Sequence, residues 1–142
     1  MYEPIRNKSV HSMAGDPDFP HRSREEELDI RLAGHLTALL TVTDELHALA
    51  PRAGGALDAA ELTAAADRIV EQVARLSGGH HPLRAEPSGG DPSRIPALHQ
   101  RARMLAGNAL SVATSRHDVA AMALTTERLE AHTTALPDLA TA

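Results

Sequence analysis

The sequence predicts an all-α protein, an antiparallel four-helix bundle, from three observations. Its 142 residues include no Trp, one Tyr and one Phe, so any core must be built from aliphatic side chains. Leu and Ala, which favour helices, outnumber Val and Ile, which favour strands. Apolar residues recur in four stretches at alternating steps of three and four, which places each set on one face of a helix. Four such helices pack most simply as an antiparallel bundle.

The first helix is predicted from about residue 24 to residue 50. Ser23 and Glu26 form a capping box, in which each side chain accepts a hydrogen bond from the other residue's backbone amide. Pro51 ends the helix. Its apolar stripe contains one histidine and consists of Leu28, Leu32, His35, Leu39, Val42, Leu46 and Leu49.

The second helix is predicted to begin at Asp58, with Glu61 three residues later as in a capping box. It ends at a glycine pair after Ser77, because glycine adopts the left-handed cap conformation freely. Its stripe is Leu62, Ala66, Ile69, Val73 and Leu76. Residues 78–92, with four glycines and three prolines, are predicted to be a flexible crossover loop.

The third helix is predicted to begin near Ser93, with the stripe Leu98, Ala102, Leu105, Ala109 and Val112. A capping pair, Ser115 and Asp118, predicts a break before the fourth helix. The fourth stripe would be Val119, Met122, Thr126, Leu129, Thr133 and Leu136, with an end at Pro137. Two alternatives share this pattern. Either the third and fourth helices are continuous, or two helical hairpins assemble as a dimer.

The domain organisation follows from these elements. Residues 1–22 carry prolines and few apolar residues, so we expect a disordered or loosely docked N-terminal arm. Residues 23–137 form the bundle, and residues 138–142 form a tail.

Composition disfavours several functions. The net charge of −5, without a basic face or aromatic platforms, argues against nucleic acid. No apolar run is long enough to cross a membrane, and no apolar signal core stands at the start, so we expect a cytoplasmic protein. The absence of Cys removes thiolate ligands and nucleophiles. No nucleophile elbow or phosphate loop is present, so an enzyme is the less favoured hypothesis.

Three histidines form the candidate site: His35, His99 and His132. If the bundle runs up-down-up-down, all three lie roughly 21–23 Å from the end that carries the two short turns. Three converging imidazoles could hold Zn or Ni and leave an open position, and no other cofactor is indicated. The same residues could form a hydrogen-bonded polar layer that fixes helix register. Arg128, one turn before His132, would repel a bound metal ion.

The sequence therefore favours a helical protein-interaction or oligomerisation module, whose partner is another protein or a second copy. Two alternatives are a transition-metal-binding four-helix bundle and a bundle that binds a small apolar ligand in its core.

Overall fold

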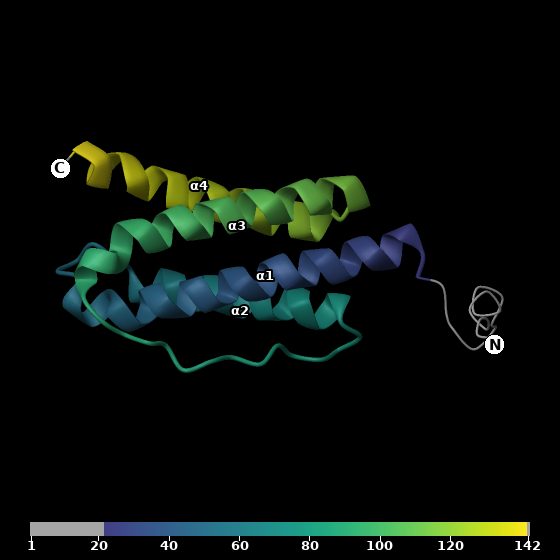
Figure 1. The fold of residues 1–142 in the computed structure, drawn as a ribbon, viewed down its shortest axis with the longest axis horizontal. Helices are drawn as coiled ribbons and strands as arrows, with labels where there is room; N and C mark the ends of the chain where they lie inside the picture. The colour runs from purple at the N-terminus through teal and green to yellow at the C-terminus, as the bar shows by residue number, and fades with distance from the viewer. Residues whose placement is uncertain (1–21, 142) are drawn as a thin grey trace, which may run out of the picture.

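The computed structural model describes residues 22–141, and for residues 137–141 it describes the backbone alone. Over this range the chain is all-helical and folds as a four-helix bundle, which confirms the predicted fold class (Figure 1). The helices are α1 (Arg24–Leu49), α2 (Ala59–Leu76), α3 (Ile95–Arg116) and α4 (Val119–Thr141), with 3-10 turns η3 (Ala50–Arg52) and η4 (Pro92–Arg94). The predicted arm lies outside the described residues, except for its last residue.

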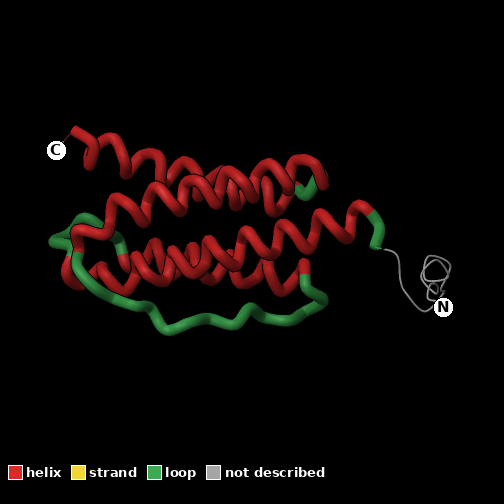
Figure 2. Tube along the Cα trace, viewed as in Figure 1, coloured by secondary structure: helices red, strands yellow, loops and turns green. Residues whose placement is uncertain are grey.

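The order of the helices in space differs from the expected up-down-up-down arrangement. The α1–α2 turn and the α3–α4 turn lie at opposite ends, and the connection from α2 to α3 runs the length of the bundle (Figure 2). Ion pairs fix these directions. Asp29 near the start of α1 binds Arg116 at the end of α3, with Nε 3.0 Å from Oδ1, and Arg75 near the end of α2 binds Asp118 at 2.8 Å. Each helix is therefore antiparallel to both of its neighbours.

The crossover between α2 and α3 is fastened to the C-terminal part of α1. The Arg84 guanidinium donates to both oxygens of Asp44 at 2.6 and 3.1 Å. The backbone amide and hydroxyl of Ser88 both donate to Glu45, each at 2.9 Å, and the amide of Ser88 holds the pKa of Glu45 below its usual value. Arg94 also binds the Glu45 carboxylate. These contacts let a glycine-rich segment span the bundle.

Local capping explains the helix starts. Ser23 and Glu26 form the predicted capping box, with bonds of 3.1 and 2.8 Å, and Asp58 caps α2 as predicted. Asp118 accepts from the amide of Ala121 at 3.1 Å. Asp118 is therefore itself the cap of α4, and the predicted box with Ser115 is wrong.

The junction between α3 and α4 is a real break, so the continuous-helix alternative is wrong. His117 takes the left-handed conformation, with φ 57° and ψ 37°, and its amide donates back to the last turn of α3. The sequence gives little warning of this cap because the position usually carries glycine. At the other end, α4 continues through Pro137 to Thr141, beyond the predicted end, since a proline can bend a helix without ending it.

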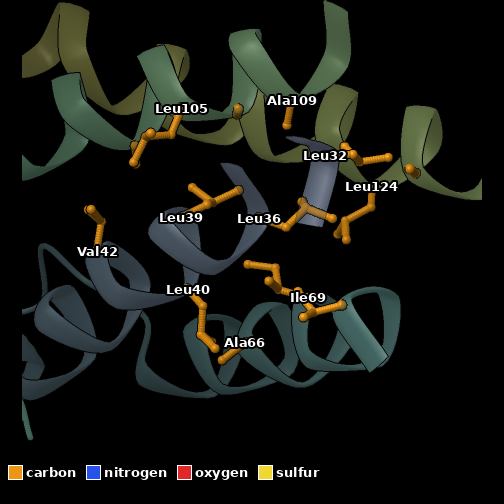
Figure 3. Packing of buried hydrophobic residues seen from close by; sticks show 14 of the residues in the cluster. Leu32, Leu36, Leu39, Leu40, Val42, Ala66, Ile69, Leu105, Ala109 and Leu124 are labelled. Carbon is orange, nitrogen blue, oxygen red and sulfur yellow. The ribbon is translucent and has the colours of Figure 1, made fainter. Parts of the chain in front are cut away.

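The core is aliphatic and centred on α1 (Figure 3). Leu36 and Leu39 point toward α3 and α4, whereas Leu40 points toward Ala66 of α2. Because α1 packs against two helices, its buried face is wider than the predicted stripe. Leu36 and Leu40 are fully buried, while His35 is only half-buried.

The predicted stripe of α3 is buried, and so is that of α2 except for half-buried Leu76, but in the stripe of α4 only Leu136 is buried. Along α4, Val119 is 76% exposed, Thr126 and Thr133 are exposed, and Met122 and Leu129 are half-buried. The residues that enter the core instead are Ala121, Leu124, Thr125, Arg128 and His132. The predicted rotation of this helix is therefore wrong by about a third of a turn. None of the described helices is both long enough and apolar enough to cross a bilayer.

A glycine at the α3–α4 junction should stabilise the protein. We expect His117→Gly to raise the free energy of unfolding by about 0.5–1 kcal/mol, because a left-handed residue with a Cβ costs about 1–2 kcal/mol and the flexibility of glycine offsets part of that. Urea denaturation measures the change. Ser115→Gly, in the right-handed last turn of α3, is the control and should be destabilising. Equal effects of both variants would contradict the account.

Candidate functional site

A polar stripe of α4 enters the core of the bundle. Thr125 is fully buried, and Arg128 and His132 are each 1% exposed. The Thr125 hydroxyl is satisfied within its own helix by the carbonyl of Ala121 at 2.8 Å. Arg128 and His132 must find partners on other helices, because a buried polar group without a hydrogen bond is destabilising. They find them on α2 and α3.

His132 meets His99 of α3 in the interior. The two Nδ1 atoms lie 2.9 Å apart, and the ring centroids lie 5.2 Å apart at an interplanar angle of 50°. The Nη2 atom of Arg128 lies 3.3 Å from Nε2 of His132. A guanidinium only donates, so this Nε2 must accept. His132 then carries its proton on Nδ1 and donates it to His99, whose own proton is on Nε2.

Arg128 connects this histidine pair to α2. Its Nη1 donates to Glu61 of α2 and, at 3.2 Å, to the neighbouring Glu127. The Glu61 side chain is 42% exposed, whereas that of Arg128 is 1% exposed. Nε of Arg128 is buried without a partner among the described residues. A buried cation is thus held by two partly exposed carboxylates, Glu61 and Glu127, on one side and by an imidazole on the other.

Both histidines are held neutral. Burial lowers the pKa of His132 to about 3, and the nearby Arg128 charge and His99 act in the same direction. Burial and Arg128 also lower the pKa of His99. Neutral rings agree with the proton positions deduced from the hydrogen bonds. Together, Glu61, Arg128, His132 and His99 form what we call the polar layer, and it joins α2, α4 and α3.

The α2–α4 contact continues this polar character. Arg68 of α2 binds Glu127 of α4 at 3.0 Å, in addition to the pair of Arg75 and Asp118. Glu61, Arg68 and Arg75 lie one after another along one side of α2. Ion pairs along this side, rather than a continuous apolar seam, therefore hold α4 beside α2.

Of the three predicted site residues, the structure brings two together. His99 and His132 are in contact, but His35 lies on α1 at another height. The ion pairs Asp29–Arg116 and Glu45–Arg94 set the α1–α3 register, and they place His35 roughly nine residues, or ~13 Å, from His99 along the axis. The expected common height assumed both short turns at one end, whereas they lie at opposite ends.

The predicted metal site therefore lacks its third ligand. Among the residues that the structure describes, no group of three or more His, Asp or Glu side chains could hold a metal ion. The guanidinium that donates to His132 also places a positive charge beside the pair, which opposes a cation. The contact between His99 and His132 instead matches the alternative interpretation, a hydrogen-bonded polar layer.

Sequence reasoning missed Arg128 and Glu61 as members of the layer. From the sequence, Arg128 is identified only as a cation one turn before His132 that would repel a metal ion. A signal existed in the spacing. Arg128 and His132 continue the steps of four and three that begin at Ala121 and Thr125, so the stripe was readable once Arg was allowed inside.

A surface pocket of about 220 Å³ lies where the crossover passes α1 and α2. Its lining is mostly polar, and Arg84 reaches into it to bind Asp44, which raises the pKa of Arg84. The residues are Asp44, His47, Leu62, Thr63, Ala66, Asp67 and Arg84. The chain itself thus supplies a cation for this acidic hollow.

Comparison of the chain with protein-family models, with curated proteins and with solved structures gives no match.

Removing the carboxylate partner of Arg128 should destabilise the fold. We expect Glu61→Gln to lower the free energy of unfolding by about 1–3 kcal/mol, because it leaves a buried cation with less compensation. Glu71→Gln, an exposed change on the same helix, should alter it by less than about 0.5 kcal/mol. Urea denaturation of both variants makes the comparison, and an equal response would show that the layer carries no stability.

The histidine pair should make stability depend on pH above the range of carboxylate titration. Because the folded pKa of His132 is lowered, the unfolded chain binds more protons, so the stabilisation is complete above about pH 6.5 and is lost as pH falls toward 3. The free energy of unfolding should then fall with decreasing pH by up to about 1.4 kcal/mol per pH unit for each such histidine.

The free energy of unfolding, measured in steps from pH 7.5 to 5, tests this pH dependence. In His132→Gln the amide can still accept from Arg128 and donate to His99, so the fold should persist with a smaller slope. His81→Gln, in the exposed crossover, should keep the slope of the unmodified chain. An unchanged slope in His132→Gln would refute the assignment.

Proposed function

We propose that the protein is a helical self-association module, in which a second copy of the chain covers the outer side of α3 and α4. One observation carries the proposal: α4 buries its Arg and His, whereas Val119 is 76% exposed and Met122 and Leu129 are only half-buried at the edge of the core. A helix ordinarily buries its apolar residues and exposes its charges. Apolar residues left at the surface beside one another indicate an interaction site.

On α4, the stripe that contains Met122 and Leu129 is on the side of the helix nearer to α3 than to α2. Glu127, about 140° or more around the helix from Met122 and Leu129, binds Arg68 of α2, so these two apolar residues lie away from α2. On α3, Leu110 lies three turns after His99 on the face that meets α4. The two stripes therefore border one surface.

We call this surface the α3–α4 face. It consists of residues that are exposed or half-buried and uncharged: Gly107, Leu110, Thr114, Val119, Met122, Thr126, Leu129 and Thr133. The two helices that carry it, α3 and α4, lie together above α1 and α2 in the view of Figure 1. By contrast, the exposed side of α2 carries Asp67, Arg68, Glu71 and Arg75.

The size of the face suits a weak dimer. From Val119 to Thr133 it is about 21 Å long, and with two helices about 18 Å wide each copy offers about 400 Å². The total of about 800 Å² is in the range of weak, transient interfaces. A second copy is the favoured occupant because the face is uncharged along most of its length, and a net charge of −5 elsewhere would otherwise keep copies apart.

The observations favour the metal and small-ligand alternatives less. The charge of Arg128 opposes a cation at the histidine pair. The pockets of about 220 and 380 Å³ are open to solvent and carry charged residues in their linings, which does not suit an apolar ligand.

A charge in the middle of the α3–α4 face should separate the copies. We expect Thr126→Glu to shift the full chain from dimer to monomer, because the new carboxylate must be desolvated on association. Thr126 is exposed in the single chain, so the fold should be unaffected, as circular dichroism can check. Size-exclusion chromatography with light scattering reads out the mass.

The matched control is Ile30→Glu, which changes an apolar residue that is 54% exposed on α1. It should leave the dimer intact. A monomeric unmodified chain, or a dimer that Thr126→Glu does not weaken, would overturn the proposed function. If the face binds another protein instead, the unmodified chain would be monomeric when pure.

A further inference from the structure

We infer that the two copies pack about a two-fold axis parallel to the helices, so that Arg103 of each copy pairs with Glu130 of the other. This inference rests on the proposed function and gives the dimer its orientation. It starts from the two exposed charged residues that border the α3–α4 face, Arg103 on α3 and Glu130 on α4. Neither makes an ion pair among the described residues.

The two charges lie at nearly the same height. His99 and His132 are in contact and fix the register of α3 against α4. Arg103 lies four residues after His99, and Glu130 lies two residues before His132. Since the helices are antiparallel, both steps lead in the same direction, and the two Cα atoms differ by only ~3 Å along the axis.

A two-fold axis parallel to the helices keeps every height and exchanges α3 with α4. Arg103 of one copy then lies opposite Glu130 of the other, and symmetry forms the pair twice. A two-fold axis across the helices would instead invert the heights. With the axis at the middle of the face, it would place Arg103 near the level of Leu110 and Glu130 near that of Val119, where neither charge has a partner and both must be desolvated.

The shape of the surface supports the first arrangement. A depression of about 380 Å³ lies beside Arg103 and is lined by Arg103, Gln100 and Met104. A carboxylate from a second copy that enters it meets a guanidinium and an amide donor, and Met104, 53% exposed, offers an apolar wall. The flexible Arg103 side chain can reach across the remaining gap.

Mixing two single variants tests the orientation. Arg103→Glu alone and Glu130→Arg alone each place two like-charged pairs in the dimer, so we expect each dimer to dissociate about tenfold more readily. When the two variants are mixed, the new carboxylate at position 103 of one copy faces the new guanidinium at position 130 of the other. The unchanged Glu130 of the first copy faces the unchanged Arg103 of the second, so the heterodimer should regain the affinity of the unmodified chain. Sedimentation velocity with one variant fluorescently labelled measures the three dissociation constants.

A control separates local pairing from net charge. Arg101→Glu and Glu71→Arg change the net charge in the same way but lie off the face, and their mixture should show no preference for the heterodimer. If the unmodified chain is a dimer and the face variants show no such preference, the orientation is overturned while the proposed function stands. If the unmodified chain is monomeric, both fall.

Discussion

Burial of the Arg128 charge is the constraint on which this structure depends. An arginine side chain stays protonated, so its charge can be buried only where hydrogen-bond acceptors surround it. Glu61 of α2 and His132 of its own helix supply them, and His99 of α3 supplies the partner that His132 needs. Satisfying one side chain therefore fixes the rotation of α4 and its height against two other helices.

The consequences extend to the surface. Once the polar stripe of α4 faces inward, the stripe from Val119 to Thr133 lies about a third of a turn away, with Val119, Thr126 and Thr133 exposed and Met122 and Leu129 half-buried at the edge of the core. Ion pairs hold α4 against α2, and alanines of α3, fully buried at 102, 106, 109 and 113, allow close helix packing. The polar layer thus sets the orientation of α4 against α2 and α3.

Much of the fold was predictable because local signals agree with it. The capping residues Ser23 and Asp58, the glycine-rich end of α2 and the aliphatic stripes of α2 and α3 each follow from propensity and spacing. The α3–α4 break was predicted too, although its left-handed residue, His117, is not one that spacing reveals. Two features were beyond sequence reasoning, and both depend on contacts between distant segments. The helix order follows from a crossover that Asp44 and Glu45 fasten to α1, so His35 could not be placed level with the other histidines. The rotation of α4 follows from Glu61 and His99, which make burial of Arg128 possible, whereas hydrophobic spacing alone takes no account of buried polar partners.

The solvent exposure of methyl groups at different protein concentrations most directly tests the rotation of α4 and the self-association of the chain. A soluble paramagnetic probe should relax the methyl groups of Val119 strongly in dilute protein and weakly in concentrated protein, because a second copy then covers them. The methyl groups of Ile30, exposed on α1, should respond equally at both concentrations. Val119 methyl groups protected even in dilute protein would contradict the rotation of α4. Methyl groups that stay exposed at every concentration would contradict self-association.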